Sequence, residues 1–403
     1  MSNQRKPRLL VLNQYYWPGV EATAQLLTEL CEALAEEMEV KVVTGVLHGH
    51  EDAPRREVHN GVEIVRVPST SFERSRILAR ATNYVTYLTN ALLKGLRGPR
   101  PDVVLCMTDP PIVADIALVT ARRFRAPLVV ISQDVFPEIA VQLKRLENPA
   151  AMKVLRFLVS LYLRRADRVV AIGETMRSRL EAKGARSDRL RVIPNWVDTD
   201  RLHPLRDDNE WARMAGLDGK FVVMHSGNVG HAQDLDSLVR AATFLRDLDG
   251  LTILIIGMGA RHAELVALAE LLEVEQVRFA YYQPRHWLTQ SLSAADLHVV
   301  GLAPGLAGYV VPSRLYGILA VGRPVIAAAD PESETAQVVE RVGCGIVVPP
   351  GRPELLARAI RDAHDGRYDL EAMGAQGREW VEREGDRSVA VRRYRDLLLE
   401  LAS

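Results

Sequence analysis

The sequence contains few cysteines, no long apolar run and no excess of either charge. Its three cysteines, Cys31, Cys106 and Cys344, lie far apart and in no metal-ligand spacing, so we expect buried thiols in a reducing compartment. The polar start and the short apolar run at 9–12 differ from a signal peptide or a membrane span, which favours a cytoplasmic protein. Lysine plus arginine and aspartate plus glutamate both number 51, and this balance argues against bulk attraction to nucleic acid.

The G-x-G-x-x-G fingerprint is also absent, which disfavours an oxidoreductase that binds a dinucleotide. The first half opens with a buried strand at 8–13, a loop containing Gly19 and a helix at 22–38. Gly19 marks either a close approach of the backbone to a ligand or a plain tight turn. The second half repeats this order from 221. We therefore predict an α/β protein of two Rossmann-like domains, joined by a polar linker that extends to Asp218.

Three polar side chains follow the predicted strand at 127–131, namely Gln133, Asp134 and Glu138. The carboxyl ends of parallel strands are where α/β enzymes place their chemistry, so Asp134 and Glu138 are candidate bases or acceptor-orienting groups. The alternative is that Asp134 caps the helix that follows.

The stretch at 305–328 is a loop, a short helix and a strand, the kind of unit that forms a phosphate site at the edge of a parallel sheet. Ser313 gives a helix-start signal, and Arg314 is the single cation of the first turn. Such a unit also occurs in α/β domains that bind no phosphate.

The helix predicted at 151–166 carries Lys153, Arg156, Arg164 and Arg165 around an apolar face. A basic amphipathic helix lies against an anionic membrane surface in some proteins, and in others it is solvated on one side and packed on the other. Both interpretations remain open, so peripheral contact with the inner face of the cell membrane is one of them.

Six motifs occur in a fixed order along the chain: PNWVD at 194–198, SGNVG at 226–230, IGMG at 256–259, YYQP at 281–284, AADLHVV at 294–300 and VVPSRLYGILAVGRPVIAA at 310–328. Together they resemble glycosyltransferase family 4, retaining enzymes of the GT-B fold, and most closely its WbuB-like subgroup of bacterial O-antigen and capsule transferases. The resemblance implies two Rossmann-like parallel-sheet domains facing a cleft. It assigns 1–200 to an acceptor-side domain, 201–384 to a nucleotide-sugar domain and 385–403 to a helix that returns to the first domain.

The resemblance also implies a donor-binding set in the second domain: Gly227, Asn228, Gly230, His231, Gly257, Gln283, Pro284, Ser313, Arg314, Tyr316 and Glu334. The amides of the 227–230 loop would face the diphosphate, and Arg314 would replace a family lysine. The segment at Gln283 would hold the nucleobase largely through its backbone. On the acceptor side the resemblance points to Gly19, Glu21 and Gln133, the last in place of a family histidine.

Two family features are missing. The glutamate pair of the E-x7-E signature is replaced by Tyr309 and Gly317, so Glu332 or Glu334 is left to reach the ribose. A family arginine and lysine near the phosphates align with Asn228 and Gln233, which leaves Arg314 and His231 as the cationic groups.

The predicted activity is transfer of a hexose-type sugar from a nucleotide diphosphate sugar, UDP-linked, to a hydroxyl acceptor with retention of configuration and without a metal or cofactor. Catalytic candidates are Asp134, Glu138 and Arg314. The acceptor is a glycan, a small molecule or a polyprenyl-linked sugar used in cell-surface polysaccharide synthesis. Two alternatives remain, a GT-B sugar-nucleotide 2-epimerase and a non-catalytic protein that binds sugar nucleotides.

Overall fold

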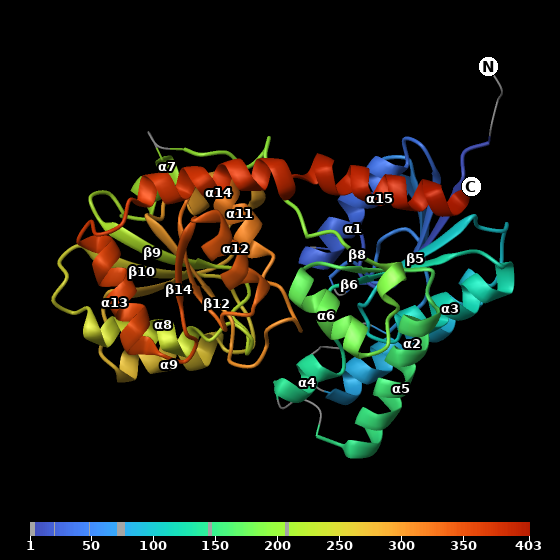
Figure 1. Ribbon diagram of the computed structural model, residues 1–403, viewed down its shortest axis with the longest axis horizontal. Coiled ribbons are helices and arrows are strands. Elements are labelled where there is room, and N and C mark those ends of the chain that lie inside the picture. Colours follow the sequence, from blue (N-terminus) through green and yellow to red (C-terminus); the bar gives the residue numbers. More distant parts are fainter. Residues whose placement is uncertain (1–4, 20, 48, 71–76, 144–146, 206–208) are drawn as a thin grey trace. The chain divides into compact units, whose positions relative to one another are not determined.

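The structure is a computed structural model that describes the chain except for residues 1–4, 20, 48, 71–76, 144–146 and 206–208, and except for the side chains of 77–81. The chain forms two compact units (Figure 1). Unit 1 comprises Met1–Pro194 and Ala390–Ser403, and unit 2 comprises Asn195–Val389.

Unit 1 is built on an eight-stranded sheet in the order β3-β4-β2-β1-β5-β6-β7-β8. All neighbouring strands are parallel except β3 and β4, which form a hairpin closed by Asn60 and Gly61, both with positive φ. The central strands are buried along their whole length because helices cover both faces, and this explains their continuous apolar sequence. The strands are β1 Arg8–Leu12, β2 Glu39–Thr44, β3 Arg56–His59, β4 Val62–Arg66, β5 Val103–Met107, β6 Leu128–Ser132, β7 Arg168–Ala171 and β8 Leu190–Val192.

The helices of unit 1 alternate with the strands, except that β2, β3 and β4 are consecutive and that α4 and α5 both follow β6. Asn148 caps α5, because its side-chain oxygen accepts hydrogen bonds from the amides of Ala150 and Ala151. The C-terminal residues of the chain are tied to this unit by ion pairs from Arg168 to Glu400 and from Arg395 to Glu37. The helices are α1 Ala22–Leu34, α2 Ile77–Gly95, α3 Val113–Phe124, α4 Glu138–Gln142, α5 Pro149–Arg165, α6 Glu174–Ala182 and most of α15 Arg387–Ala402.

Unit 2 contains a six-stranded, fully parallel sheet in the order β11-β10-β9-β12-β13-β14. Its strands are β9 Phe221–Ser226, β10 Leu251–Ile256, β11 Val277–Ala280, β12 Leu297–Gly301, β13 Val325–Ala328 and β14 Gly345–Val348. Its helices are α7 Glu210–Met214, α8 Leu235–Ala241, α9 His262–Leu271, α10 Leu288–Ser293, α11 Arg314–Ala320, α12 Glu334–Val342, α13 Pro353–His364 and α14 Leu370–Glu384. This is the repeated strand, glycine loop and helix order that the sequence predicts.

The linker predicted to extend to Asp218 is wrong in its second half, because that stretch contains α7. Trp211 of α7 is only 6% exposed and packs in a cluster with Val222 and Met224 of β9 and Leu254 of β10. A single large aromatic side chain buries enough apolar surface to order a five-residue helix that the polar composition hides.

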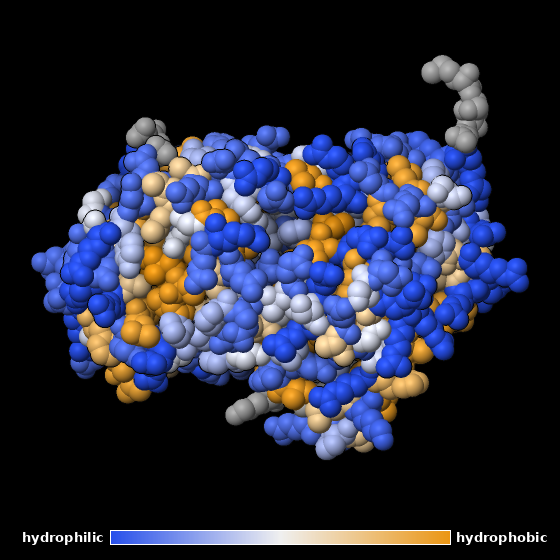
Figure 2. Space-filling view, viewed as in Figure 1, coloured by the Kyte–Doolittle hydropathy of each residue, from blue (hydrophilic) through white to orange (hydrophobic). Residues whose placement is uncertain are grey.

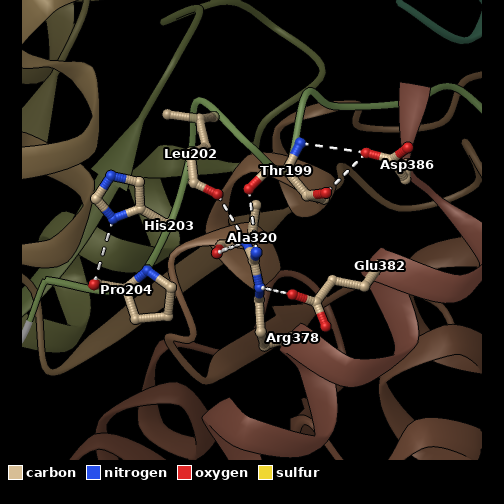
Figure 3. Close-up of polar contacts among 8 residues, drawn as sticks. All are labelled: Thr199, Leu202, His203, Pro204, Ala320, Arg378, Glu382 and Asp386. Carbon is tan, nitrogen blue, oxygen red and sulfur yellow. Dashed lines mark hydrogen bonds and ion pairs between the residues drawn. The ribbon is translucent and has the colours of Figure 1, made fainter. Parts of the chain in front are cut away.

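The segments that enter and leave unit 2 are joined to each other (Figure 3). Arg378 of α14 donates to the backbone oxygens of Thr199, Leu202 and Ala320 and pairs with Glu382. Asp386 accepts from both the amide and the hydroxyl of Thr199. The entry segment is therefore fixed to α11 and α14 by charge-assisted hydrogen bonds.

Candidate functional site

The carboxyl edge of the unit 2 sheet brings two glycine turns together. Gly227 follows β9 and Gly257 follows β10, both with φ near the left-handed range at +146° and +141°. A Cβ at Gly257 would overlap the carbonyl of Gly227, so this position excludes any side chain. The two glycine turns therefore pack directly against each other at this edge.

The amides of the 227–230 loop are mostly used inside the protein. Gly227 N–H donates to Ile256 O at 2.9 Å, and Val229 N–H donates to Met258 O at 3.1 Å. Gly230 N–H donates to the side-chain oxygen of Gln233 at 3.0 Å. These three amides already have acceptors within the protein, so they are not free donors for the diphosphate that the family resemblance would place there.

Arg314, the first residue of α11, supplies the charge at this edge. Its Nη1 atom lies 3.0 Å from both ring nitrogens of His225, which is fully buried on β9. The same atom would lie 3.7 Å from a Cβ at Gly227, so the guanidinium borders the glycine loop. Within the described residues, no carboxylate lies within 4.0 Å of a nitrogen of Arg314.

The pKa values of His225 and Arg314 describe a charged arginine beside a neutral histidine. Burial, and then the positive charge of Arg314, hold the pKa of His225 well below its usual value, so the imidazole is neutral. Burial also lowers the pKa of Arg314 to about 10, which leaves the guanidinium charged at neutral pH. A charged guanidinium whose hydrogen-bond partner is neutral favours binding of an anionic ligand.

Tyr282 completes the edge beside Gly257. Its hydroxyl donates to Met258 O at 3.3 Å, its ring lies against Gly257, and 54% of the residue is exposed. Burial raises its pKa while the nearby charge of Arg314 opposes that rise. Tyr282 therefore lies within the electrostatic reach of the candidate anion site.

The predicted donor residues fall into different environments. Gln283 uses its whole amide inside the protein, because its oxygen accepts from Trp211 Nε1 and its nitrogen donates to Tyr281 O, each at 2.8 Å. The side chain of Gln283 is therefore already bonded within the protein. Pro284 immediately precedes the 3₁₀ turn Arg285–Trp287. Asn228 and His231 are both exposed.

Tyr316 is not at the surface. It is 2% exposed, and its ring lies 6.1 Å from that of Trp380 on α14, so it packs α11 onto α14 instead of facing solvent. Ser313 precedes α11 without a side-chain cap bond. Glu334 begins α12 and raises the pKa of Tyr316, after the larger effect of burial.

The position of the missing family glutamate is apolar. A Cβ at Gly317 would lie 3.7 Å from Leu292 and 3.8 Å from Leu202, with no closer atom. A carboxylate at this position would start out against two leucines, which disfavours its charged form.

In unit 1, Asp134 and Glu138 have contrasting surroundings. Burial raises the pKa of Asp134 to about 6, within the range suited to a general base near neutral pH. Glu138 instead pairs with Arg156 at 3.2 Å and with Lys183, and so links α4, α5 and the end of α6. The carboxylate of Glu138 is therefore already engaged by two cations within the protein.

The other acceptor-side residues lie at the carboxyl edge of the unit 1 sheet. The backbone amide of Gln133 donates to the hydroxyl of Thr108. Gly19 N–H donates to Tyr16 O at 2.8 Å, and a Cβ at Gly19 would contact that oxygen and Glu21 at 2.8 Å. The turn is therefore tight, as one of the two interpretations of Gly19 requires. Glu21 precedes α1 and makes no side-chain cap bond.

Sequence reasoning missed several residues of these edges. His225 lies one residue before the SGNVG motif and Tyr282 lies inside YYQP, so the motifs that contain or border them were the available signal. At the end of β1, Asn13 and Gln14 are buried, and their side-chain oxygens have no hydrogen-bond partner. Their position directly after a buried strand was the signal there.

Among the described residues no three His, Cys, Asp or Glu side chains are grouped as metal ligands would be. In the same part of the chain, every helix is too short or too polar to cross a bilayer.

Two sequence families match the chain in succession. Residues 21–196 match the family described as "Glycosyl transferase 4-like domain", and residues 207–380 match "Glycosyl transferases group 1". Together the two matches leave out only the ends of the chain and a short stretch between the halves.

Individual proteins support the same assignment. The chain is 26% identical over 397 residues to the probable glycosyltransferase WbjE of Pseudomonas aeruginosa, covering 96% of each protein. It is 30% identical over 236 residues to the putative colanic acid biosynthesis glycosyl transferase WcaI of Escherichia coli, covering 58% of this chain and 57% of that protein.

Solved structures share the fold at low identity. HepE of Anabaena, in complex with UDP and glucose, superposes with a TM-score of 0.77 at 15% identity over 98% of this chain and 100% of that one. WaaG, a glycosyltransferase involved in lipopolysaccharide biosynthesis, superposes with a TM-score of 0.69 at 17% identity over 97% and 99%.

Proposed function

Because the chain belongs to the group 1 glycosyltransferases of family 4 and has their GT-B fold, we propose that it transfers a sugar from a UDP-linked donor to a hydroxyl acceptor with retention of configuration. The observation that carries the proposal is Arg314, a charged guanidinium whose hydrogen-bond partner is a neutral imidazole. It lies beside the glycine turns at Gly227 and Gly257, here called the glycine edge. UDP is favoured as the nucleotide because HepE was solved with UDP.

The donor diphosphate is assigned to the glycine edge of unit 2. Cleavage of the bond between sugar and phosphate leaves negative charge on the departing oxygen, so a fixed cation there stabilises the transition state. Arg314 supplies that charge, and its planar group contacts two oxygens at once. Gly227 lies next to Arg314 and carries no side chain between the guanidinium and the backbone, so a phosphate can approach the backbone there.

The acceptor is assigned to the carboxyl edge of the unit 1 sheet. In a retaining reaction on one face of the sugar, the departing phosphate oxygen takes the proton of the acceptor hydroxyl. Asp134 orients that hydroxyl, since its pKa of about 6 leaves it largely ionised at neutral pH. Glu138 acts indirectly, because its pairing with Arg156 and Lys183 holds α4 in place.

The exposed surface of helix α5 suggests what kind of molecule carries the acceptor. Val154 is 58% exposed and Phe157 is 66% exposed, close in sequence to the exposed Lys153 and Arg156. Figure 2 shows apolar patches over α4 and α5 between hydrophilic side chains. Exposed apolar anchors among cations suit an anionic lipid surface, so the proposed acceptor is carried by a lipid and used for cell-surface polysaccharide.

The first experiment is a binding panel of nucleoside diphosphates and their sugars, followed by product analysis with and without acceptor. We expect UDP to stabilise the protein and a UDP-sugar to be consumed only when an acceptor is present. A new sugar nucleotide formed without acceptor would favour the epimerase, and binding without any turnover would favour the non-catalytic alternative.

The membrane part of the proposal has its own test. Wild-type protein should sediment with vesicles containing phosphatidylglycerol and stay in solution with phosphatidylcholine vesicles. The variant Phe157→Ser should bind the anionic vesicles several-fold less, because it removes an exposed apolar anchor. Val119→Ser on α3, at a position 50% exposed, is the matched control. Equal losses in both variants would contradict a specific role for α5.

A further inference from the structure

The segment Tyr281–Pro284, here called the YYQP segment, leaves β11 at the same edge as Arg314 and Gly257. It has no regular secondary structure, and its two tyrosines are 72% and 54% exposed. Tyr282 contacts the glycine edge, and Tyr281 stacks on His262 with ring centroids 6.5 Å apart and planes 11° apart. Exposed aromatic faces near the guanidinium of Arg314, the proposed phosphate ligand, suit a flat nucleobase.

A chain of hydrogen bonds fixes the backbone of this segment from behind. The indole N–H of Trp211 donates to Gln283 Oε1, and Gln283 Nε2 donates to Tyr281 O, both at 2.8 Å. The amide of Gln283 thus bridges α7 to the residue just after β11. Without this bridge, the Tyr282 hydroxyl bond to Met258 O at 3.3 Å would be the main remaining side-chain anchor of the tyrosines.

Trp211 is itself held firmly. Its backbone amide donates to Gln290 Oε1 at 3.0 Å, and Asn209, which caps α7, donates to Gln290 O at 2.7 Å. The indole is nearly buried against β9 and β10. The N–H that reaches Gln283 is therefore fixed by packing and by two hydrogen bonds to α10.

A cavity of about 280 Å³ lies between α7 and β11, and Trp211, Met214, Arg278 and Gln283 contribute to its lining. The side chain of Gln283 consequently has space to change rotamer once its acceptor contact to Trp211 is lost. A packed neighbour would have prevented that change, so the hydrogen bond and not steric confinement fixes Gln283.

We propose that Trp211, acting through Gln283, is a positioning residue that sets nucleobase selection at the donor site. The inference rests on the proposed function and on the expectation from the family resemblance that the segment at Gln283 holds the nucleobase. Selection requires that the backbone edges of the segment keep a fixed position, because a base differs from its competitors only in where its donors and acceptors lie. The diphosphate is held elsewhere, by Arg314.

The test compares Trp211→Phe and Gln283→Leu with the wild type by calorimetric titration of UDP, GDP, ADP and inorganic pyrophosphate. Trp211→Phe keeps an aromatic ring and removes the N–H, and Gln283→Leu removes the other half of the bridge. Each variant should reduce the ratio of affinities between the best and the worst nucleotide about fivefold to tenfold, and leave pyrophosphate affinity unchanged. The double variant should lose no more than either single one, because both remove the same interaction.

Met214→Leu is the matched control, since it alters the lining of the same cavity without a side-chain hydrogen bond to the segment. An unchanged affinity ratio in both test variants would overturn the inference while leaving the proposed function intact. An equal change in Met214→Leu would also overturn it, because the cavity and not the bridge would then select the base. A wild-type protein that binds pyrophosphate and no nucleotide better than pyrophosphate would overturn both the proposed donor and this inference.

Discussion

Two arginines of unit 2 differ in how their charge is used: Arg314 is the first residue of α11, and Arg378 of α14 contacts the last residue of α11. Arg378 donates to three backbone oxygens and pairs with Glu382, so nearly all of its donors have protein acceptors (Figure 3). Arg314 is partly buried and has the neutral imidazole of His225 as its hydrogen-bond partner. An arginine whose N–H groups all have protein acceptors stabilises the fold, whereas a charged arginine without a neighbouring anion can bind an anionic ligand.

The largest expected effect is on the satisfied arginine. Arg378→Ala leaves the oxygens of Thr199, Leu202 and Ala320 without a donor, and we expect the free energy of unfolding to fall by about 3 kcal/mol. Denaturant unfolding of unit 2 measures this loss. UDP affinity of the remaining folded protein should not change, and a variant of normal stability would show that water replaces these contacts at no cost.

The opposite result is expected at the other end of α11. Arg314→Ala should reduce turnover by more than about tenfold, because it removes a charge-assisted contact to the leaving group. Stability should stay equal or rise, since an uncompensated cation is lost. Steady-state kinetics and thermal melting report the two effects, with Arg240→Ala, at an exposed position on α8, as the control. Intact turnover would contradict the phosphate assignment.

A smaller effect on stability is expected in unit 1, at Asp134. The pKa of Asp134 is raised in the folded state, so the folded protein binds the proton more tightly than the unfolded chain. Stability therefore falls as pH rises from the usual aspartate range through about 6. Asp134→Asn should be more stable than wild type by about 2 kcal/mol at pH 7.5, with no difference near pH 3.

The same variant tests the role of Asp134 in the reaction. Acceptor-dependent kcat/KM in the wild type should decrease below about pH 6, and Asp134→Asn should lose that decrease together with several-fold activity. Unchanged acceptor kinetics would reduce Asp134 to a structural residue at the end of β6.

The smallest effect concerns the position of the missing glutamate. Gly317→Ala adds a methyl group on α11 whose nearest neighbour, Leu292, would lie at an ordinary contact distance of 3.7 Å, so the protein should gain about 0.5 to 1 kcal/mol of stability. Gly257→Ala is the contrasting control, because its Cβ would overlap Gly227 and should abolish both folding and UDP binding. A destabilised Gly317→Ala would show that the gap beside Leu202 and Leu292 is smaller than the structure indicates.

The family and the fold were predictable because they are encoded in the order of local motifs. Continuous apolar strands, glycine turns and the run of Pro312 to Ala328 each follow from short-range sequence, and the family and fold inferred from them are confirmed. The individual site residues remain predictions, and their surroundings could not be derived in the same way. Nothing local marks Tyr316 as buried or Glu138 as paired with two cations from other helices.

By itself, the sequence determined the repeated α/β architecture, the glycine positions where the backbone must turn and the presence of a cation at Arg314. The tertiary structure decided which charge is left without a counterion, which amides are already bonded and which aromatic side chain is exposed. The physical reason is the distance along the chain over which each property is determined. Backbone conformation depends on neighbouring residues, whereas burial, pairing and pKa depend on side chains that arrive from strands and helices distant in the chain, as His225 does at Arg314 and Trp211 at Gln283.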